Sequence, residues 1–454
     1  MIKSRITIIV LCLSLIITAL AGCGERPGSS QIVLTIWHVY GDQSDSPLNE
    51  YISQFNETIG KEQGIRVVVT SVGSTNNIHQ AVLSAIRRDP GAPSLPDMFI
   101  SHPKTIVTLE DIDILVDYLD YFTDAELALY VRPFVEEGII DNKLLIFPVA
   151  KSTELLFVNK TLFDRFAGAT GAVLSDLATW EGLFETARLY AEWTEAQAQD
   201  TAGGKAFIAH DYPYHYMQIG VESLGESFFD DTGLSFGDGY MTVWEPLARA
   251  AILGGVWLEE GFASSGPMRT AEALVSIGSS ASVLYNPSHV TYPDNTTEEV
   301  EIIALPCPVF RDGSELAVQR GGGFCTVKST PEREAAAAVF LKWLTEPERN
   351  TSFTTTAGYL PVMEEAYDKY LEPAIGSLTL PAYIELYQAV LMMQASYTFH
   401  TPPNLPNYLV IEEAATHAIR ASLQEARRNH ISEPDIPIDV LVEEAFDNFR
   451  IFMR

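Results

Sequence analysis

Histidine and carboxylate side chains are the residues of this sequence best suited to chemistry, and their spacing decides which chemistry that would be. The run His210-Asp211-Tyr212-Pro213-Tyr214-His215 carries metal-ligating atoms. Pro213 interrupts helical spacing between the two histidines, so a surface loop is favoured over a metal site. Adjacent carboxylates such as Glu136-Glu137 and Glu259-Glu260 have the groups of a general acid and base, but they are typical of solvated faces in an acidic chain.

Zinc-protease and nucleotide-binding signatures are missing from the sequence. No HExxH, GxGxxG or GxxxxGK[ST] segment occurs, and these are the patterns that mark common zinc and phosphate sites. We therefore expect no enzyme activity, no cofactor and no metal. The alternative is a glycan-hydrolysing enzyme that uses a carboxylate pair in a cleft.

The charge balance excludes two classes of partner. The chain has 60 Asp and Glu residues against 29 Lys and Arg residues, a formal net charge of −31. A surface this acidic repels nucleic-acid phosphates and anionic lipid headgroups. We expect no nucleic-acid partner and no polybasic docking to a membrane.

The length predicts more than one lobe. The 454 residues are about three times the roughly 150 residues of an average domain. Hydrophobic residues make up 47% and charged residues 20% of the chain, which indicates a compact globule rather than a disordered one.

The N-terminus predicts export and a lipid anchor. Lys3 and Arg5 precede an apolar run over 6–20, and Ala21-Gly22-Cys23 ends it with small residues. This ending resembles a bacterial lipobox and implies a signal peptide over 1–22 with acylation of Cys23. The run is short for a transmembrane anchor. Residues 23–31 are rich in Gly, Pro and Ser and predict a tether, so we expect the protein at the cell envelope, held by lipid at a membrane surface.

The cysteines leave two interpretations open. Cys12 lies in the predicted signal peptide and Cys23 is the predicted lipid site, which leaves Cys307 and Cys325. They form a disulfide or are two small buried packing residues. Neither belongs to a CxxC pair, which argues against a zinc or redox site.

The predicted elements alternate between strands and helices after the tether. Strands are expected over 32–37, 64–70 and 97–100, with helices starting at Ser46-Pro47 and spanning 78–88. This βαβαβ order predicts a parallel sheet covered by helices.

The rest of the chain predicts crossings between two lobes. Strands are expected over 144–150, 155–158, 300–305 and 323–327, on either side of a mainly helical region from 160 to 300. We therefore predict a first lobe of 32–154 plus 300–345, and a helix-rich second lobe of 155–299 plus 346–454.

Short motifs occur along the chain in a characteristic order. They are Thr35-Ile36-Trp37-His38, Leu95-Pro96-Asp97-Met98, the segment 147–160, Thr179-Trp180, Gly321-Gly322-Gly323-Phe324 and Gly358-Tyr359-Leu360-Pro361-Val362. Together with the lipobox they resemble the extracellular solute-binding proteins of bacterial ABC importers. The resemblance covers nearly the whole mature chain. It implies an α/β periplasmic-binding-protein-like fold (type II), with a hinge between two lobes that close on a solute.

The same resemblance implies the ligand class and the partners. The segment from Gly358 to Val362, followed by Ala366-Tyr367, is most similar to periplasmic glycerol-3-phosphate-binding proteins. In these proteins an arginine after a proline-rich stretch holds the phosphate. The corresponding residues 401–409 contain no arginine, so we predict a neutral sugar or related polyol, with glycerol-phosphate-type solutes as the alternative. We expect a monomer that delivers its ligand to a membrane permease.

The candidate ligand-binding residues follow strands or lie where the chain crosses between lobes. Ligands of open α/β sheets collect at the carboxyl ends of strands, and glycines let a ligand approach the backbone. The resemblance adds the cleft aromatic, Tyr359. The predicted set is Trp37, His38, Ser74, His102, Ser152, Thr153, Glu154, Ser288, Gly322, Gly323 and Tyr359.

Most of these residues have a structural alternative. Trp37 has the character of a core residue, His38 of a histidine satisfied beneath the first helix, and His102 and Ser288 of surface loops. The alternative role of Ser152 and Thr153 is to hydrogen-bond with backbone groups where the chain crosses between the lobes. The alternative role of the glycines is to form a turn. Trp180 is expected in the core.

Overall fold

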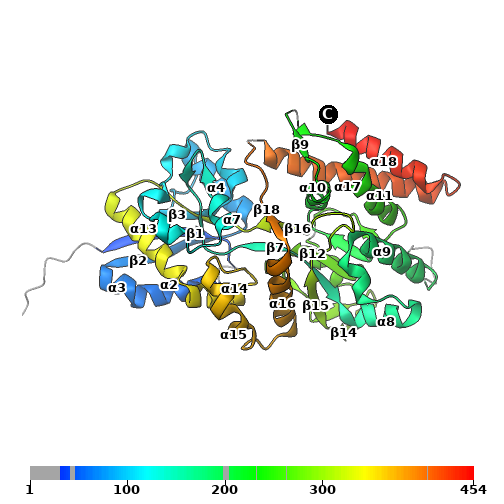
Figure 1. Cartoon of the computed structure of the whole chain (residues 1–454), viewed down its shortest axis with the longest axis horizontal. Coiled ribbons are helices and arrows are strands. Elements are labelled where there is room, and N and C mark those ends of the chain that lie inside the picture. The colour runs from blue at the N-terminus through cyan, green and yellow to red at the C-terminus, as the bar shows by residue number, and fades with distance from the viewer. Residues whose placement is uncertain are drawn as a thin grey trace, which may run out of the picture.

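Two lobes lie side by side and share a narrow middle region (Figure 1). A computed structural model describes residues 31–40, 46–197, 204–231, 233–261, 263–405 and 407–453. The predicted signal peptide, Cys23 and the tether up to residue 30 lie outside these ranges. Within them, no helix has both the length and the apolar character needed to cross a membrane.

The first lobe is built on a five-stranded sheet in the order β2-β1-β3-β17-β6. Strand β1 runs parallel to β2 and β3, while β17 is antiparallel to β3 and β6. The predicted βαβαβ opening is therefore confirmed. The elements are β1 (Ile32–His38), α2 (Pro47–Glu57), α3 (Ile59–Gln63), β2 (Ile65–Val72), α4 (Thr75–Arg87), β3 (Met98–Ser101), α5 (Pro103–Ile106), α6 (Asp124–Leu127), α7 (Arg132–Glu136), β4 (Ile139–Ile140), β5 (Lys143–Leu144), β6 (Phe147–Pro148), β17 (Gly323–Thr326), α13 (Pro331–Leu344) and α14 (Pro347–Ala357).

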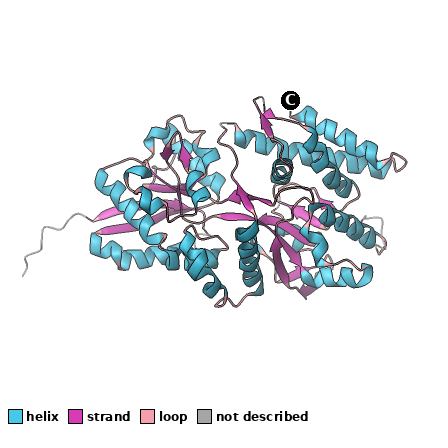
Figure 2. Cartoon of the chain, in the orientation of Figure 1, coloured by secondary structure: helices cyan, strands magenta, loops and turns pink. Residues whose placement is uncertain are grey.

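The second lobe contains a seven-stranded sheet covered by helices (Figure 2). Its strands run in the order β11-β8-β12-β7-β16-β18, and β15 pairs with residues 155–159 of β7. The strands are β7 (Ser152–Asn159), β8 (Ile208–His210), β11 (Val256–Trp257), β12 (Val275–Ser279), β15 (Ile302–Pro306), β16 (Leu316–Arg320) and β18 (Thr398–His400). The main helices are α8 (Lys160–Thr170), α9 (Trp180–Glu195), α10 (Pro213–Ser223), α11 (Asp238–Ile252), α16 (Pro381–Ser396), α17 (Tyr408–Ser432) and α18 (Ile438–Phe452).

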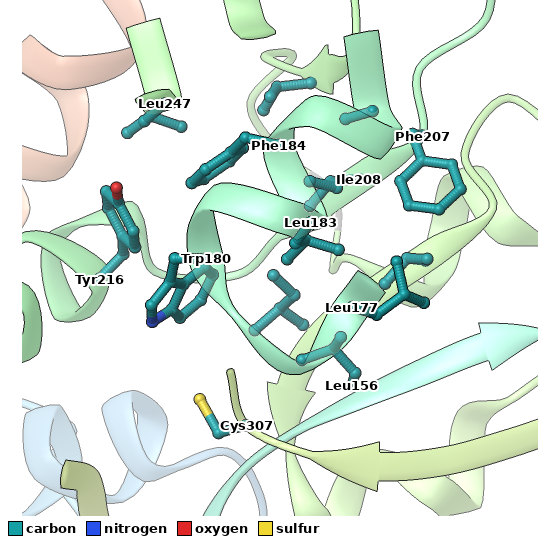
Figure 3. Close-up of a cluster of buried hydrophobic side chains, with 14 of the residues drawn as sticks. Leu156, Leu177, Trp180, Leu183, Phe184, Phe207, Ile208, Tyr216, Leu247 and Cys307 are labelled. Carbon is teal, nitrogen blue, oxygen red and sulfur yellow. The ribbon is translucent and has the colours of Figure 1, made fainter. Parts of the chain in front are cut away.

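Aromatic packing fixes the helices of the second lobe on their sheet. Thr179 caps α9, since its hydroxyl accepts from the Gly182 amide at 3.2 Å. Trp180 then packs edge-on against Tyr216 of α10, with ring centroids 4.7 Å apart, and stacks with Phe184 (Figure 3). The expectation that Trp180 is a core residue is confirmed, because only 2% of its surface is exposed.

Two antiparallel segments join the lobes. The chain passes from β6 to β7, and later from β16 to β17, and these passages pair with each other at both ends. A third passage follows α14, where Leu360 exchanges backbone hydrogen bonds with Lys151. The hinge region predicted from the sequence therefore consists of adjacent backbone segments.

The lobe boundaries differ from those expected at two places. Residues 302–320 belong to the second sheet, because β15 pairs with β7 and β16 pairs with both β7 and β18. Helix α14 packs on the first lobe instead, where the Phe353 ring contacts Tyr40 and Tyr51. The pairing partners of these segments are distant in sequence, so local patterns did not reveal them.

The two remaining cysteines are buried in different hydrophobic clusters. Cys307 lies in the second lobe's hydrophobic cluster, and Cys325 in a separate cluster of the first lobe. Both thiols are free in the described part of the chain. The structure therefore supports the interpretation that both cysteines are small buried packing residues, rather than partners in a disulfide.

Candidate functional site

A cavity of about 520 Å³ lies between the two lobes. The first lobe contributes Tyr40, Thr75, Asn76, His102 and Lys104 to its wall, and the crossing segments contribute Ser152, Arg320, Gly322 and Tyr359. The second lobe contributes Asp211, Tyr212, His215, Ser279, Glu412 and Arg420.

The sheets place the cavity at the carboxyl ends of their parallel strands. Tyr40 follows β1 and His102 follows β3, while Asp211 follows β8 and Ser279 ends β12. Loops that follow neighbouring parallel strands gather at the same edge. Two such edges, one from each lobe, therefore face the same space.

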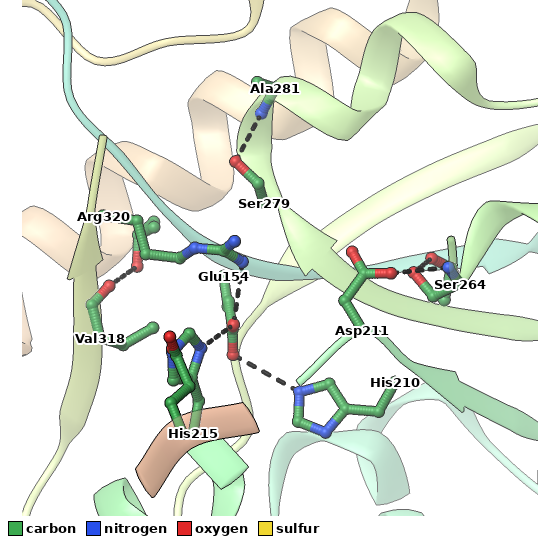
Figure 4. Close-up of polar contacts among 12 residues, drawn as sticks. Glu154, His210, Asp211, His215, Ser264, Ser279, Ala281, Val318 and Arg320 are labelled. Atoms are coloured by element: carbon green, nitrogen blue, oxygen red, sulfur yellow. Dashed lines mark hydrogen bonds and ion pairs between the residues drawn. The ribbon is translucent and has the colours of Figure 1, made fainter. Parts of the chain in front are cut away.

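Glu154 is the centre of a buried polar network behind the cavity wall (Figure 4). Its Oε1 lies 2.7 Å from His215 Nδ1 and accepts a hydrogen bond from Arg320 Nη1 at 3.0 Å. His210 Nε2 lies 3.5 Å from its Oε2. Burial raises the pKa of this carboxyl, but the combined effect of His215, His210 and Arg320 is larger and opposite. The pKa of Glu154 is therefore well below its usual value.

The network continues from Glu154 to the opposite lobe. His215 Nε2 lies 3.0 Å from Glu412 Oε1 on α17, and the Lys104 ammonium on α5 donates to Glu412 Oε2 at 2.6 Å. Glu412 is buried, yet His215 and Lys104 hold its pKa at about 2. The Lys104–Glu412 ion pair is thus a direct contact between the lobes.

The prediction of a surface loop around His210 and His215 is wrong. Pro213 occupies the first turn of α10, where a missing backbone N–H costs nothing, and the helix carries His215 into the interior. In the described part of the chain, no group of three or more His, Cys, Asp or Glu side chains is arranged to hold a metal. The histidines serve hydrogen bonding to carboxylates instead.

Aromatic rings supply the apolar part of the cavity wall. Tyr359 packs edge-on against Tyr40, with ring centroids 5.1 Å apart, and the Arg320 guanidinium lies 4.5 Å from the Tyr212 ring centroid. Burial and Tyr285 raise the pKa of Tyr359 to about 12, although Arg320 opposes the shift. Its hydroxyl is protonated at neutral pH and is able to donate a hydrogen bond.

His102 adds a neutral imidazole to the first-lobe side of the cavity. Burial, together with the positive charges of Lys104, Lys151 and Arg320, lowers the pKa of His102 to about 3. A neutral ring offers one donor and one acceptor nitrogen. Such a group suits a hydroxyl, which also donates and accepts.

Four predicted residues line the cavity, namely His102, Ser152, Gly322 and Tyr359. Two others lie directly behind the wall. The Thr153 hydroxyl donates to the Val318 carbonyl at 3.0 Å, and Glu154 holds Arg320 and His215. These two side chains support the lining rather than form it.

The other predicted residues have other surroundings. Trp37 packs in the first-lobe core, and both ring nitrogens of His38 are engaged, with Asn49 on α2 and with the Tyr40 amide. Ser74 caps α4, whose next residues, Thr75 and Asn76, line the cavity. Ser288 hydrogen-bonds with exposed His289 and is not part of the lining.

The glycines of the crossing are required by close packing of strands. A Cβ on Gly323 would overlap the Phe147 carbonyl oxygen and lie 2.8 Å from Ile146 Cγ2. A Cβ on Gly322 would lie 2.5 Å from the Ser101 carbonyl oxygen. Both positions therefore keep β17 against its neighbouring strands.

Replacing Gly323 with alanine is expected to lower the free energy of unfolding by about 1–3 kcal/mol, because strand β17 must move away from β6. The matched control is Gly168→Ala on α8, where an added Cβ meets nothing within 4 Å and helix propensity favours alanine by about 0.5–1 kcal/mol. Urea unfolding of both variants tests this. Equal stability of the two variants would contradict the packing argument.

The charged residues of the wall were not predicted from the sequence. Lys104, Arg320 and Glu412 come from three distant segments, and no local motif connects them. One signal was present for Arg320, since a charged residue at the end of an apolar strand and directly before three glycines is unusual. Glu412 resembled the many other acidic residues of the chain.

Comparisons with known proteins support the arrangement of two lobes. The sequence profile of bacterial extracellular solute-binding proteins matches residues 50–376. Comparison with curated proteins gives no match. The described fold is similar to that of the cyclic alpha-maltosyl-1,6-maltose binding protein from Arthrobacter globiformis, with a TM-score of 0.66 and 18% identity over 93% of this chain and 99% of that one.

Two further solved structures show the same likeness. UgpB from Mycobacterium tuberculosis in complex with glycerophosphocholine has a TM-score of 0.66 and 16% identity, covering 94% of this chain and 99% of that one. The substrate-binding protein Lmo0181 from Listeria monocytogenes in complex with cycloalternan has a TM-score of 0.65 and 13% identity, covering 93% and 99%. At these identities the likeness concerns the fold, and the expected two-lobe α/β fold is confirmed.

Proposed function

Because the chain belongs to the family of bacterial extracellular solute-binding proteins, we propose that its cavity captures a neutral sugar or related polyol and releases it chemically unaltered. The observation that carries this proposal is the position of the cavity between the lobes, with hydroxyl-binding groups and aromatic rings in one wall. Sugars present hydroxyls together with apolar C–H faces, and both kinds of group find partners here.

The pairing of the cations favours an uncharged ligand. Three lysine and arginine side chains occur in the lining. Lys104 is paired with Glu412, Arg320 with Glu154, and Arg420 donates to the backbone carbonyls of His210 and Asp211. An anion would have to compete with these protein partners, so a phosphate-bearing solute is the weaker candidate.

The size of the cavity fits a small carbohydrate. Ligand cavities of about 300–1,000 Å³ hold drug-sized molecules, and this one has about 520 Å³. Related structures contain maltose, maltotriose, mannotriose and glycerophosphocholine, according to their descriptions. These four compounds are therefore suitable probes.

The cellular role that we propose is supported by the family and by the N-terminal motif. We propose that the predicted lipid on Cys23 holds a monomeric receptor at the cell envelope, and that the receptor delivers its ligand to the permease of an ABC importer. The closed arrangement of the lobes would be the form that the permease recognises. Mass spectrometry of the membrane fraction tests the anchor, because a Cys23→Ala variant should lose both the acyl mass and the membrane association.

Replacing Tyr359 with alanine is expected to weaken ligand binding by about tenfold or more, since one aromatic stacking contact contributes about 0.5–1.5 kcal/mol beyond its buried area. Isothermal titration calorimetry with the four probes measures the effect. The control is Tyr121→Ala in the first lobe, outside the cavity lining, where the hydroxyl donates to Glu334. An unchanged dissociation constant for Tyr359→Ala would reject this role for the ring.

A further inference from the structure

The His215 ring lies between two carboxylates. Its Nδ1 is 2.7 Å from Glu154 Oε1, and its Nε2 is 3.0 Å from Glu412 Oε1. A neutral imidazole has one N–H donor and one lone pair, whereas an imidazolium donates from both nitrogens. An ionised carboxylate only accepts. Both contacts are therefore hydrogen bonds only when the ring carries its second proton.

The surroundings of the ring favour this positive charge. Strand β7 presents Glu154 and helix α17 presents Glu412, while β16 presents the opposing charge of Arg320. On its own helix and the loop before it, the Tyr214 and Tyr212 rings lie tilted to the His215 ring, with centroids 6.1 and 5.0 Å away. Beyond the two carboxylates lie His210 of β8 and Lys104 of α5. The ring thus contacts two anions directly, while the cations Arg320 and Lys104 are each bound to one of those carboxylates.

We propose that His215 is a positioning residue of the binding cavity, whose imidazolium orders Glu154 and Glu412 and thereby fixes Arg320 and Lys104 in the wall, so that proton loss from the ring loosens the contact between the lobes. The predicted change in ligand affinity rests on the proposed binding function. The ordering of the carboxylates is independent of any ligand.

The consequence of deprotonation follows from the same geometry. A neutral ring would turn one lone pair toward a carboxylate oxygen, and one of the two contacts would become repulsive. The Glu412 contact is the one that leads across the cavity, since its second oxygen binds Lys104 of the first lobe. Burial lowers the pKa of His215, but the combined effect of Glu154 and Glu412 is larger and opposite. The pKa of His215 is therefore raised.

The raised pKa of His215 determines the direction of the pH effect. Because the pKa of His215 is raised in the folded protein, its stabilising contribution is complete below the pKa of an unfolded histidine, about 6.5. It is lost as the pH rises through the folded pKa. Stability and the contact between the lobes should therefore decrease toward alkaline pH.

The first experiment uses the ligand-free protein with isotope-labelled histidine. Nitrogen NMR at pH 7, with His215→Gln to assign the signal, should show both ring nitrogens of His215 protonated. A neutral ring at pH 7 would overturn the proposal. Because no ligand is present, this result is independent of the proposed function.

The second experiment compares pH profiles of wild-type protein and His215→Gln, whose amide cannot become charged. Wild-type affinity for maltotriose should fall roughly five- to tenfold between pH 6 and pH 9, a usual size for coupling between two binding events, and the variant should be flat. The control His289→Gln removes an exposed histidine outside the cavity lining, which hydrogen-bonds with Ser288, and should keep the wild-type slope. Parallel slopes for wild type and His215→Gln would overturn the proposal.

The two experiments separate the possible failures. If maltotriose does not bind, the urea midpoint replaces affinity as the readout in the second experiment. The wild type should then exceed His215→Gln in stability by more at pH 6 than at pH 9. A difference that is the same at both pH values would indicate packing alone and would contradict the positioning role.

Discussion

Replacing Glu154 with alanine is expected to lower the free energy of unfolding by about 3–5 kcal/mol and to abolish ligand binding. The carboxylate is buried and holds His215 at 2.7 Å and Arg320 at 3.0 Å. Its removal leaves two cationic groups without their acceptor in a poorly hydrated site. Urea unfolding at pH 7 and calorimetry with maltotriose measure the two effects.

The control for Glu154 is Glu259→Ala, because Glu259 is exposed and surface charges of this kind contribute about 0–1 kcal/mol. The isosteric Glu154→Gln should lie between the two variants, since it keeps an acceptor but loses the charge. The depressed pKa of Glu154 adds a pH signature. Its contribution is present at neutral pH and is lost as the pH falls through the folded pKa. A loss below about 1 kcal/mol for Glu154→Ala would contradict the central position that we assign to this residue.

Replacing Lys151 with methionine is expected to cost about 3–5 kcal/mol of stability, because it leaves the buried carboxylate of Glu137 without its ion-pair partner. The Lys151 ammonium bonds to Glu137 and also donates to the Gly321 carbonyl at 2.7 Å. It thus joins the two antiparallel crossing segments to the first lobe at Glu137, the residue that follows α7. Thermal and urea unfolding test the prediction.

A double-variant cycle separates the ion pair from general packing. Lys151→Met combined with Glu137→Leu should cost less than Lys151→Met alone, because replacing both charges of a buried pair is often neutral. Gln319 also donates to Glu137, so a small loss should remain. Strictly additive costs would show that the two side chains do not interact.

Local patterns were sufficient to predict the opening of the first lobe. Apolar runs such as 32–37 and 64–70, each followed by an amphipathic helix, have one well-packed arrangement, which is a parallel sheet covered on its faces. The positions of His102 and Ser152 in the cavity wall followed from this topology. His102 comes directly after a parallel strand, and Ser152 lies at a crossing.

The polar network could not be predicted in the same way. Lys104 and Glu412 meet across 308 residues, and Glu154 and Arg320 across 166. In a chain with 60 acidic residues, nothing local distinguishes Glu412 from a solvated carboxylate. Pro213 was misread for a related reason, since a proline breaks a helix in its interior but is favoured in its first turn.

The crossing region contains residues that stabilise the first lobe and residues that support the cavity wall. Lys151 binds Glu137 of the first lobe, while Glu154, three residues later, binds His215 and Arg320 beside the cavity. A change in the angle between the lobes requires these few residues, or their neighbours in the crossing segments, to change conformation. Variants on either side of the crossing should therefore affect ligand binding more than exposed substitutions do.

Native mass spectrometry of the freshly purified protein, alone and after incubation with maltose, maltotriose, mannotriose and glycerophosphocholine, tests the central claim most directly. We predict a non-covalent complex with a neutral carbohydrate, from which the compound dissociates with its original mass. Hydrolysis fragments in place of the intact compound, or bare protein under every condition, would contradict the claim.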